Sequence, residues 1–467
     1  MANKNHVVVI GAGPGGYAAA FRAADLGNKV TLIEKDETLG GVCLNRGCIP
    51  SKTLLHLSKT IDDVESVKKA GIEFLEPKID MKKIQVWKNR VIKKLGGGIK
   101  LLAKKRNVNI SHGEASFISD KSIKIINKDK EEIINFDQCI IATGSRPNSL
   151  PFLEIDHDQI LDSTSVLSLN KIPKDMLVIG GGYIGLEMAT VYSSFGAEVS
   201  VVEFLPKLLA GADEDLVNIL NKKLKGKLNE IMVDTKVLGS KKVKGGIEVE
   251  MESKTGILSK IYEKILVSVG RIPNTDNISL GNTGVNVDKK GFIHVDEYRR
   301  TNIHGIYAIG DVTGDPMLAH KATHEGKIAA EVCTGIPSAF EPQAIPAVIF
   351  TDPEIAWAGK TENELIESNT PYEKAEFPWQ ASGKAISIDR TEGKTKILFE
   401  PKSKRVIGVG IAGVNAGDLI GEAALSIEMG CYAEDIALTI HPHPTLTENF
   451  SNTAEVMEKT ITDLYLK

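Results

Sequence analysis

The chain has 467 residues, 42% of them hydrophobic, and a formal net charge of −4 at pH 7. This length predicts two to four domains with ample apolar material for their cores. The near balance of 57 basic and 61 acidic residues gives no basic patch for a nucleic acid, and no apolar run reaches the roughly 20 residues that span a bilayer. A strand begins almost at once, at 6–10, so we expect no signal peptide and a soluble, cytoplasmic protein; a removed organelle transit peptide stays open.

A glycine-rich nucleotide-binding pattern follows this first strand. Gly11, Gly13 and Gly16 form G-x-G-x-x-G, a helical run at 17–26 comes next, and a second strand ends in Glu34. This order fits a βαβ unit in which a pyrophosphate lies at the helix N-terminus and the acid binds ribose hydroxyls.

Two cysteines, Cys43 and Cys48, follow in the segment GGVCLNRGCIPSK. Two neighbouring thiols beside a bound electron carrier can take two electrons from a dithiol and pass them on. Residues five apart in a regular helix have Cα atoms roughly 8–9 Å apart, whereas a disulfide needs roughly 4.4–6.8 Å. Gly47 and Pro50 therefore predict a distorted first turn, with regular helix only from about Ser51. No metal site is predicted, because no histidine or further cysteine lies within four residues of either thiol.

Two long helical stretches, at about 51–70 and 80–106, and a hairpin-like segment at 114–136 come next. Three glycines at 96–98 weaken the second of these helices. The remaining cysteines are predicted to be buried or inert thiols: Cys139, Cys333 and Cys431.

The nucleotide-binding pattern returns with Gly180, Gly182 and Gly185, again between a strand and a helix. An acid, Glu203, follows the first of these glycines by 23 residues, the same spacing as in the first unit. Glu203 can accept a hydrogen bond from a free 2′-hydroxyl and would repel a 2′-phosphate. The first cation after it is Lys207, so this unit is predicted to prefer NAD over NADP.

Similar segments, 140–148 and 266–274, close the two units. A strand ending in Asp311 and a helix at 319–334 follow, and from about 347 strands and helices alternate without a nucleotide motif. The predicted class is α/β, with two Rossmann-like dinucleotide-binding domains and a C-terminal α+β domain that fits an interface role. A third glycine pattern is predicted to be a strand end and loop. The predicted domain boundaries are 1–148, 149–274, a central segment at 275–346 that completes the first site, and 347–467.

The cysteine segment resembles the active site of the pyridine nucleotide–disulfide oxidoreductases, and the similarity covers essentially the whole chain. Three further segments, VGRIPN at 269–274, FPWQASGK at 377–384 and HPHPTLTE at 441–448, resemble the branch of that family that oxidises dihydrolipoyl groups. The resemblance implies a homodimer with shared active sites. It places FAD on the first glycine-rich pattern with its acid, here called the first fingerprint, and NAD on the second fingerprint. It also implies, as partner, the lipoyl-bearing E2 core of a 2-oxo acid dehydrogenase complex or the glycine cleavage carrier protein, with no membrane and no nucleic acid.

The resemblance further assigns individual residues. Cys43 becomes the interchange thiol and Cys48 the thiol nearer the flavin, while Lys52 lies by the reactive flavin nitrogen and pairs with Glu187. The alternatives are a surface lysine and an ordinary acid in a first helical turn. The implied FAD contacts are Gly11, Gly13, Gly16, Glu34, Lys52, Gly113, Thr143, Gly144, Asp311 and Ala319; the implied NAD contacts are Gly180, Gly182, Gly185, Glu203 and Gly270.

His443 and Glu448 allow two interpretations. Thr445 and Glu448 have the spacing of a capping box, which is a sufficient structural reason for the acid. Thiol oxidation also needs a base, because only a thiolate attacks a disulfide. The resemblance makes His443 that base, oriented by Glu448, and implies a cis bond before Pro444. Both roles of Glu448 are expected to hold only if its side chain serves the ring in place of the cap.

Four further residues receive no catalytic role. Arg46 stands where family members often have an uncharged residue, and it is expected to add a positive charge beside the thiols. His441 receives no role. His320 and His324 are expected to pack near the flavin or an interface rather than to move protons.

The reaction implied by the resemblance has two halves. His443 takes a proton from the dihydrolipoyl dithiol, the thiolate attacks Cys43 of the other subunit, and the second substrate thiol releases the lipoyl group. Cys48 is left as a thiolate, and electrons pass through FAD to NAD, giving NADH. A glutathione-type reductase driven by NADPH is disfavoured by Glu203, and a mercuric reductase normally carries a C-terminal cysteine pair that 463–467 lacks. A single-cysteine peroxidase or oxidase, or a non-enzymatic flavin-dependent binding protein, would lack part of the dithiol and base.

Overall fold

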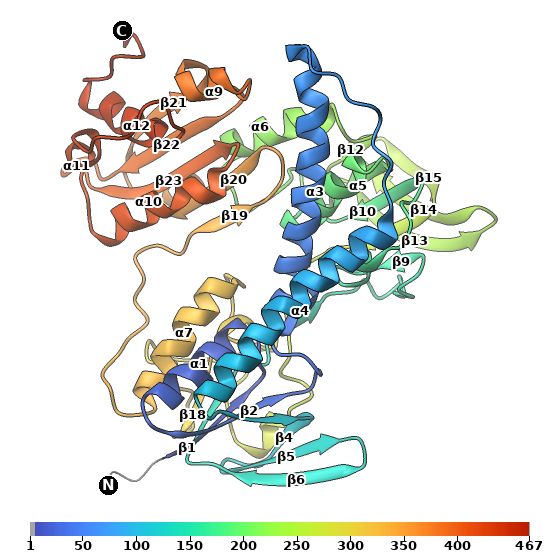
Figure 1. Ribbon diagram of the computed structural model, residues 1–467, viewed down its shortest axis with the longest axis vertical. Helices are drawn as coiled ribbons and strands as arrows, with labels where there is room; N and C mark the ends of the chain where they lie inside the picture. The colour runs from blue at the N-terminus through green and yellow to red at the C-terminus, as the bar shows by residue number, and fades with distance from the viewer. Residues whose placement is uncertain (1–4, 467) are drawn as a thin grey trace.

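A computed structural model describes residues 5–466 of the chain (Figure 1). Its first sheet is entirely parallel, and its central strands are apolar runs buried on both faces, as parallel strands covered by helices require. The helix α1 (Pro14–Asp25) packs closely on α7 (Ala319–Val332), because a Cβ on Gly326 would lie 2.4 Å from the carbonyl oxygen of Gly15. The strands lie in the order β18 (Ile306–Ala308), β7 (Gln138–Ile141), β1 (His6–Ile10), β2 (Lys29–Glu34) and β3 (Asn109–His112).

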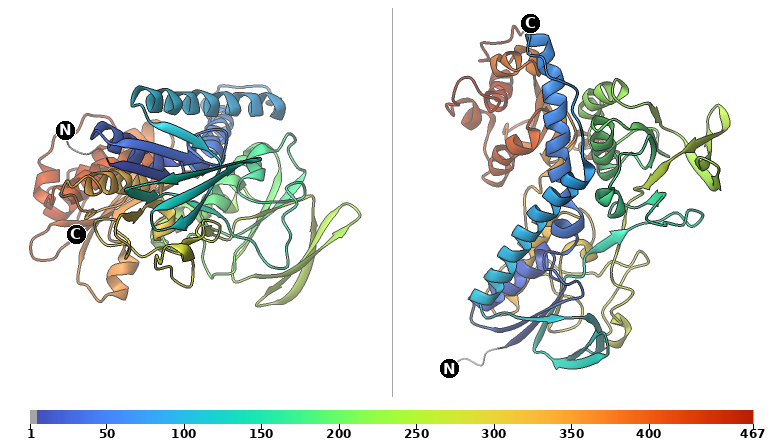
Figure 2. Two further views of the ribbon diagram at one scale, coloured as in Figure 1. Left: turned by 90° about the horizontal axis from the view of Figure 1, so that it is seen from below. Right: turned by 45° about the vertical axis from the view of Figure 1, so that its right-hand side comes forward.

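Long helices and a small sheet are inserted between β2 and β7. The predicted helix at 80–106 forms despite its three glycines, and α3 lies between the C-terminal domain and the second dinucleotide unit in Figures 1 and 2. The segment predicted as a hairpin, 114–136, contains three antiparallel strands instead of two. The inserted elements are α2 (Gly41–Arg46), α3 (Cys48–Ser66), η1 (Val67–Ala70), α4 (Met81–Lys105), β4 (Glu114–Ser119), β5 (Ser122–Asn127) and β6 (Lys130–Asn135).

The second unit repeats the first. A parallel sheet carries α5 (Tyr183–Ser194) and α6 (Glu214–Lys225), and an antiparallel sheet, β13 to β15, projects away from it (Figure 2). The similar closing segments pair with each other as antiparallel strands β8 (Ser145–Pro147) and β17 (Arg271–Pro273). The other elements of this unit are β9 (Ile160–Leu161), η2 (Ser165–Ser168), β10 (Asp175–Ile179), β11 (Glu198–Val202), β12 (Glu230–Met232), β13 (Lys236–Val243), β14 (Gly246–Ser253), β15 (Gly256–Tyr262) and β16 (Lys264–Val267). The chain then returns to the first unit, where η3 (Leu280–Asn282) contacts β4 and η4 (Gly310–Thr313) contacts α7.

An antiparallel sheet forms the core of the C-terminal part. The third glycine pattern, Gly408, Gly410 and Gly413, lies at the end of strand β23 (Val406–Gly413), so the predicted strand end is confirmed and the predicted loop is wrong. These glycines allow close packing, since a Cβ on Gly408 would lie 1.9 Å from the Lys360 carbonyl oxygen. The other elements are β19 (Ala347–Ile349), β20 (Glu354–Gly359), α8 (Glu362–Glu367), β21 (Glu373–Pro378), η5 (Trp379–Ala381), α9 (Gly383–Ser387), β22 (Lys394–Phe399), α10 (Ala416–Glu428), α11 (Ala433–Ala437) and α12 (Glu448–Glu458).

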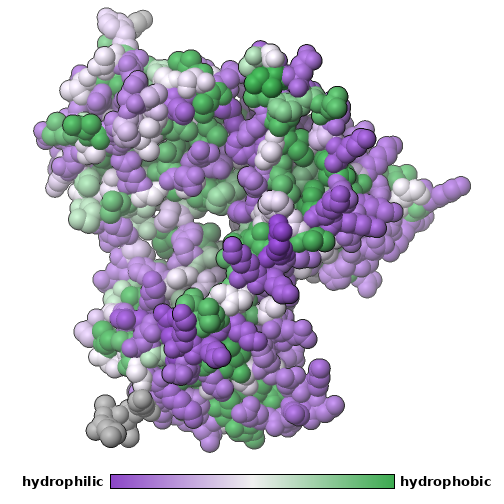
Figure 3. Space-filling view, viewed as in Figure 1, coloured by the Kyte–Doolittle hydropathy of each residue, from purple (hydrophilic) through white to green (hydrophobic). Residues whose placement is uncertain are grey.

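The predicted α/β class, with two dinucleotide-binding units and a separate C-terminal domain, is confirmed. Large apolar side chains lie exposed on the C-terminal domain, which shows green patches in Figure 3; they include Leu425, Met429, Leu438 and Ile440. Within residues 5–466, none of the helices has the length and apolar character needed to cross a membrane.

Candidate active site

A cavity of about 920 Å³ opens at the carboxyl ends of β1, β2 and β7. Its volume is at the upper end of the roughly 300–1,000 Å³ that is usual for ligand sites. The cavity brings together all ten residues implied as FAD contacts, although they come from seven separate segments of the chain. These lining residues are Gly11, Gly13, Gly16, Glu34, Lys52, Gly113, Thr143, Gly144, Asp311 and Ala319.

The three glycines of the first fingerprint have different structural reasons. Gly11 has φ +99°, and a Cβ there would lie 2.3 Å from the carbonyl oxygen of Ala142. A Cβ on Gly16 would lie 1.8 Å from the carbonyl oxygen of Gly11, so this glycine lets the helix approach the turn. A Cβ on Gly13 would meet nothing closer than 4.0 Å and would point into space at the helix N-terminus. This open cradle of backbone N–H groups fits a pyrophosphate.

The acids of the two fingerprints make the same bonds. Glu34 accepts the backbone N–H of Ala12 at 2.9 Å and that of Asp36 at 3.0 Å. Glu203 accepts the N–H of Gly181 at 2.6 Å and that of Leu205 at 2.8 Å. Each carboxylate is therefore held against its glycine turn with lone pairs left for ribose hydroxyls.

The second fingerprint lies next to the cavity but outside its lining among the described residues. The helix α5 that follows Gly182 is a shared wall, because its residues Tyr183, Ile184 and Glu187 face the cavity. The residues implied as NAD contacts are Gly180, Gly182, Gly185, Glu203 and Gly270.

Asp311 is held by residues that the sequence reasoning missed. The Ser145 hydroxyl donates a short hydrogen bond to the Asp311 carboxylate, and Arg271 donates to the same hydroxyl at 2.7 Å and to the Ser145 carbonyl oxygen at 2.7 Å. The buried Glu325 accepts the N–H of Gly310 at 2.6 Å. Ser145 and Arg271 come from the paired strands β8 and β17, so the similar closing segments were the available sequence signal.

The two thiols lie on separate short helices. Cys43 is in α2 and Cys48 begins α3, while Gly47, with φ −142° and ψ −109°, breaks the helix between them. The predicted distortion is therefore present, but regular helix starts at Cys48 and not at about Ser51. This break, which a continuous helix would not allow, brings the side chains into hydrogen-bonding contact.

Their contact gives the two thiols opposite acidities. The hydrogen bond from Cys43 and the charge of Lys52 lower the pKa of Cys48 to about 7, against the opposing effect of burial. The same hydrogen bond, together with burial, raises the pKa of Cys43 well above its ordinary value. Cys48 is thus the sulfur that carries the negative charge of the reduced pair near neutral pH.

Lys52 and Glu187 form a well-defined ion pair at the cavity wall. The Lys52 ammonium lies 2.9 Å from both carboxylate oxygens, and the Glu187 side chain is 3% exposed. Phe350, which sequence reasoning missed, packs its ring 4.4 Å from the ammonium and donates its N–H to Glu187 at 3.2 Å. A cation at this place stabilises a neighbouring thiolate and a reduced, anionic acceptor.

Arg46 does not place its charge beside the thiols as expected. Its guanidinium pairs with Asp36, which lies two residues after Glu34. The side chain therefore points toward the β2 end of the cavity, and Asp36 neutralises it. Residue spacing alone gave no signal for this direction.

His443 and Glu448 are in direct contact. The ring Nδ1 lies 2.8 Å from Glu448 Oε1, while Glu448 Oε2 accepts the N–H of Thr445 at 2.7 Å. The predicted capping box does not form, because α12 begins at Glu448 with Thr447 as its N-cap residue and without a side-chain cap. The Glu448 side chain serves the ring in place of the cap, as expected, and its second oxygen holds the Thr445 N–H. The peptide bond before Pro444 is cis, as the resemblance implied. Within the described chain, His443 lies outside the cavity lining, and its ring is 77% exposed.

The other histidines make packing contacts. His441 lies between the carbonyl oxygen of Thr439 at 2.8 Å and the carboxylate of Glu422 at 2.7 Å, so it ties the His443 loop to α10. His320 bonds the carbonyl oxygen of Pro346 at 2.7 Å, and His324 packs edge-on against Phe340. Cys139 and Cys333 are buried, as predicted, and Cys431 is half-buried.

Comparison with known proteins gives a consistent result. Residues 5–326 match the family model described as pyridine nucleotide-disulphide oxidoreductase, and 345–454 match its dimerisation domain. The dihydrolipoyl dehydrogenase of Vibrio cholerae is 49% identical over 462 residues, which are 99% of this chain and 97% of that protein. The same-named protein of Geobacillus stearothermophilus is 43% identical over 456 residues, or 98% and 97% of the two chains.

The fold matches solved structures as well. The crystal structure of LpdA from Mycobacterium tuberculosis superposes with a TM-score of 0.91 at 24% identity, covering 97% of this chain and 99% of that one. The flavoprotein disulfide reductase RclA from Escherichia coli gives a TM-score of 0.85 at 24% identity, with the same coverage. At these identities the likeness shows the fold alone.

Proposed function

We infer the reaction from one premise: the chain belongs to the pyridine nucleotide–disulphide oxidoreductase family. It is an FAD-containing enzyme that oxidises dihydrolipoyl groups to lipoyl groups and reduces NAD to NADH. The observation that carries this proposal is the Cys43–Cys48 pair, which lines the cavity together with Lys52. When bound, FAD supplies a two-electron carrier between this thiol pair and NAD.

The proton chemistry is proposed to start at His443. Because its Nδ1 faces the Glu448 carboxylate at 2.8 Å, Nδ1 carries the hydrogen and Nε2 is left to accept a proton from a substrate thiol. The resulting thiolate attacks a sulfur of the Cys43–Cys48 disulfide. The second substrate thiol then attacks the substrate sulfur of this mixed disulfide and expels the cysteine, so the substrate becomes a disulfide and the protein pair becomes a dithiol.

The acidities of the two thiols favour Cys43 as the sulfur that is attacked. Attack on Cys43 expels Cys48, whose pKa of about 7 makes it the better leaving group. Attack on Cys48 would expel Cys43, whose pKa is raised. Lys52 lies near Cys48 and stabilises the thiolate that this step produces.

We propose that the active site is completed by a second copy of the chain. His443 lies outside its own cavity lining, and the C-terminal domain exposes large apolar side chains such as Ile440, which is 96% exposed. In the dimer, His443 of one subunit would serve Cys43 of the other. Mixed dimers of Cys43→Ser chains and His443→Ala chains test this: each mixed dimer holds one intact site and should regain activity, and no recovery would contradict the shared site.

The proposed partner is the lipoyl-bearing E2 core of a 2-oxo acid dehydrogenase complex, or the glycine cleavage carrier protein, in the cytoplasm. We further propose that 1–148 binds FAD, 149–274 binds NAD, 275–346 completes the FAD site and 347–467 forms the dimer interface. Apolar side chains on the C-terminal domain and the lining of the cavity by 311–322 support the last two assignments.

The experiment that tests the reaction measures NAD reduction by free dihydrolipoamide. We expect the purified protein to reduce NAD faster than NADP, and Cys48→Ser to abolish the reaction while flavin stays bound. Cys431→Ser is the matched control, because this half-buried thiol lies outside the cavity lining among the described residues. Full activity of Cys48→Ser, or a preference for NADP, would contradict the proposed function.

A further inference from the structure

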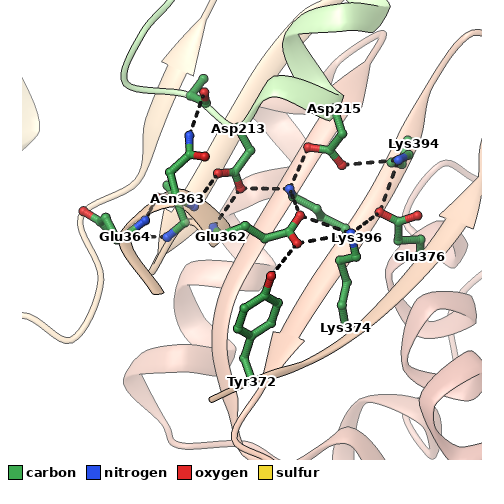
Figure 4. Close-up of polar contacts among 12 residues, drawn as sticks. Asp213, Asp215, Glu362, Asn363, Glu364, Tyr372, Lys374, Glu376, Lys394 and Lys396 are labelled. Carbon is green, nitrogen blue, oxygen red and sulfur yellow. Dashed lines mark hydrogen bonds and ion pairs between the residues drawn. The ribbon is translucent and has the colours of Figure 1, made fainter. Parts of the chain in front are cut away.

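A buried ammonium group joins the second dinucleotide unit to the C-terminal domain (Figure 4). The Lys396 side chain is 1% exposed, and its Nζ lies 2.8 Å from Asp213, 2.7 Å from Asp215 and 2.6 Å from Glu362. Burial alone would lower the pKa of Lys396, but these carboxylate contacts raise it. The three carboxylates offer the ligand spacing of a cation site, and the ammonium occupies that position.

Asp213 uses its carboxylate across the domain boundary instead of on its own helix. It is the N-cap residue of α6, yet its side chain makes no capping bond there. Its oxygens accept the N–H groups of Glu362 at 3.0 Å and Asn363 at 3.1 Å, at the start of α8. Asp213 therefore contacts both Lys396 and the first turn of a helix in the C-terminal domain.

The same aspartate ends the loop that begins at Glu203. Within this loop, Leu209 donates its N–H to the carbonyl oxygen of Gly181 at 3.0 Å, and Gly181 donates its own N–H to Glu203 at 2.6 Å. Leu208 packs over the glycine turn, because a Cβ on Gly181 would lie 2.5 Å from its Cδ2. Ala212, next to Asp213 in the chain, donates its N–H to the carbonyl oxygen of Leu209 at 2.8 Å, so a short hydrogen-bonded turn links the nucleotide turn to the anchored Asp213.

We propose that Lys396 and Asp213 are positioning residues for NAD. By fixing the far end of the 203–213 loop to the C-terminal domain, they hold Glu203 and the Gly181 N–H in the geometry that the adenosine ribose needs. The inference rests on the proposed function only in placing NAD on the second fingerprint. Because binding coupling is reciprocal, bound NAD also tightens the contact between the two domains.

The first test replaces Lys396 in the intact enzyme. In Lys396→Met, we expect NADH to bind the oxidised enzyme about tenfold more weakly, within the roughly 5- to 150-fold range of coupled sites. The KM for NAD should rise alike, while kcat and the KM for dihydrolipoamide change by less than about twofold, since the thiol site does not contact this cluster. A merely structural role would lower stability and leave the NADH affinity of the folded enzyme unchanged.

Lys374→Met is the matched control. Lys374 belongs to the same ion network, but among residues 5–466 its ion pairs are with Glu362 and Glu376, both within the C-terminal domain. Its replacement should leave NADH affinity at the wild-type value. Equal affinity in folded Lys396→Met and in this control would overturn the proposal.

A second test needs no variant and covers the case in which Lys396→Met does not fold. In the wild-type enzyme, saturating NADH should slow hydrogen exchange of the α8 amides of Glu362 and Asn363, which donate to Asp213. Unchanged exchange at these amides would overturn the proposal. If the wild-type protein binds no NADH at all, the proposed function fails; if it binds NADH and only these responses are absent, the positioning role alone fails.

Discussion

Replacing the second glycine of each fingerprint by alanine should separate FAD binding from NAD binding. Gly13 has φ −68° and ψ −178°, and Gly182 has φ −77° and ψ 176°, which are ordinary extended angles for alanine. A Cβ on Gly13 would have Gly41 Cα as its nearest neighbour, at 4.0 Å, and one on Gly182 would have nothing within 4 Å. Without cofactor, each alanine substitution should therefore raise the free energy of unfolding of the protein by about 0.4–1 kcal/mol, because it restricts the unfolded chain.

With cofactor the same methyl group stands where a pyrophosphate approaches the backbone. Losing one hydrogen bond from an N–H to a charged group costs about 1.5–3 kcal/mol. Since 1.4 kcal/mol is a factor of ten, the dissociation constant should rise by about 10- to 150-fold. Gly13→Ala should therefore lose affinity for FAD, and Gly182→Ala should keep its flavin and lose affinity for NAD.

The assay needs three measurements on each purified variant. Flavin content comes from visible absorbance, FAD affinity from titration of the apoprotein, and NAD affinity from titration of the flavin-loaded protein with NADH. Alanine at the third glycine is the steric control, because a Cβ on Gly16 or Gly185 would lie 1.8 Å or 2.2 Å from a carbonyl oxygen. Those variants should not fold normally. Loss of flavin from Gly182→Ala, or weakened NADH binding by flavin-loaded Gly13→Ala, would refute the assignment of the two sites.

Three further predictions concern the thiols and the base. In the reduced protein, the Cys48 thiolate should disappear as pH falls through about 7, because the pKa of this thiol is lowered. Lys52→Met should shift the midpoint upward, as measured by alkylation rates over a pH series. An unchanged midpoint would exclude the effect of the cation. Arg46→Val should leave the midpoint unchanged, and a shift would show that its charge reaches the thiols. Glu448→Gln should lower kcat about tenfold, the difference of about 1–1.5 kcal/mol between charged and neutral acceptors, and undiminished kcat would exclude its role at His443.

The two nucleotide-binding units could be predicted because their signals are local. Each glycine turn, its helix and its acid lie within 23 residues, and chain geometry fixes how such a segment folds. Because the spacing is the same, Glu34 and Glu203 accept equivalent backbone hydrogen bonds, from the N–H groups of Ala12 and Gly181. The cysteine segment was also local, and Gly47 marked the break between its helices, although the first helical residue was placed about three positions too late.

Contacts between distant segments could not be predicted in this way. Phe350 reaches Lys52 across about 300 residues, and Asp213 reaches Glu362 across 149. Asp213 is the N-cap residue of α6, a position where an aspartate usually bonds its own helix, yet its side chain makes no such bond. Closeness in sequence can also mislead: Arg46 is two residues from Cys48, yet its side chain points toward Asp36. Neighbours in sequence share a region, but the backbone direction decides which group a side chain meets.

The Glu448 side chain shows why a structural reason and a catalytic reason need not compete. A carboxylate has two oxygens with separate directions, so one bonds the Thr445 N–H while the other bonds the His443 ring. The bond to Thr445 removes the freedom that Glu448 would otherwise have to turn away from the ring. The start of α12 therefore fixes the orientation of the base, as precise catalysis requires of the groups that support it. A glutamate that bonded only the Thr445 N–H, or only the ring, would leave one oxygen free and the imidazole less firmly held.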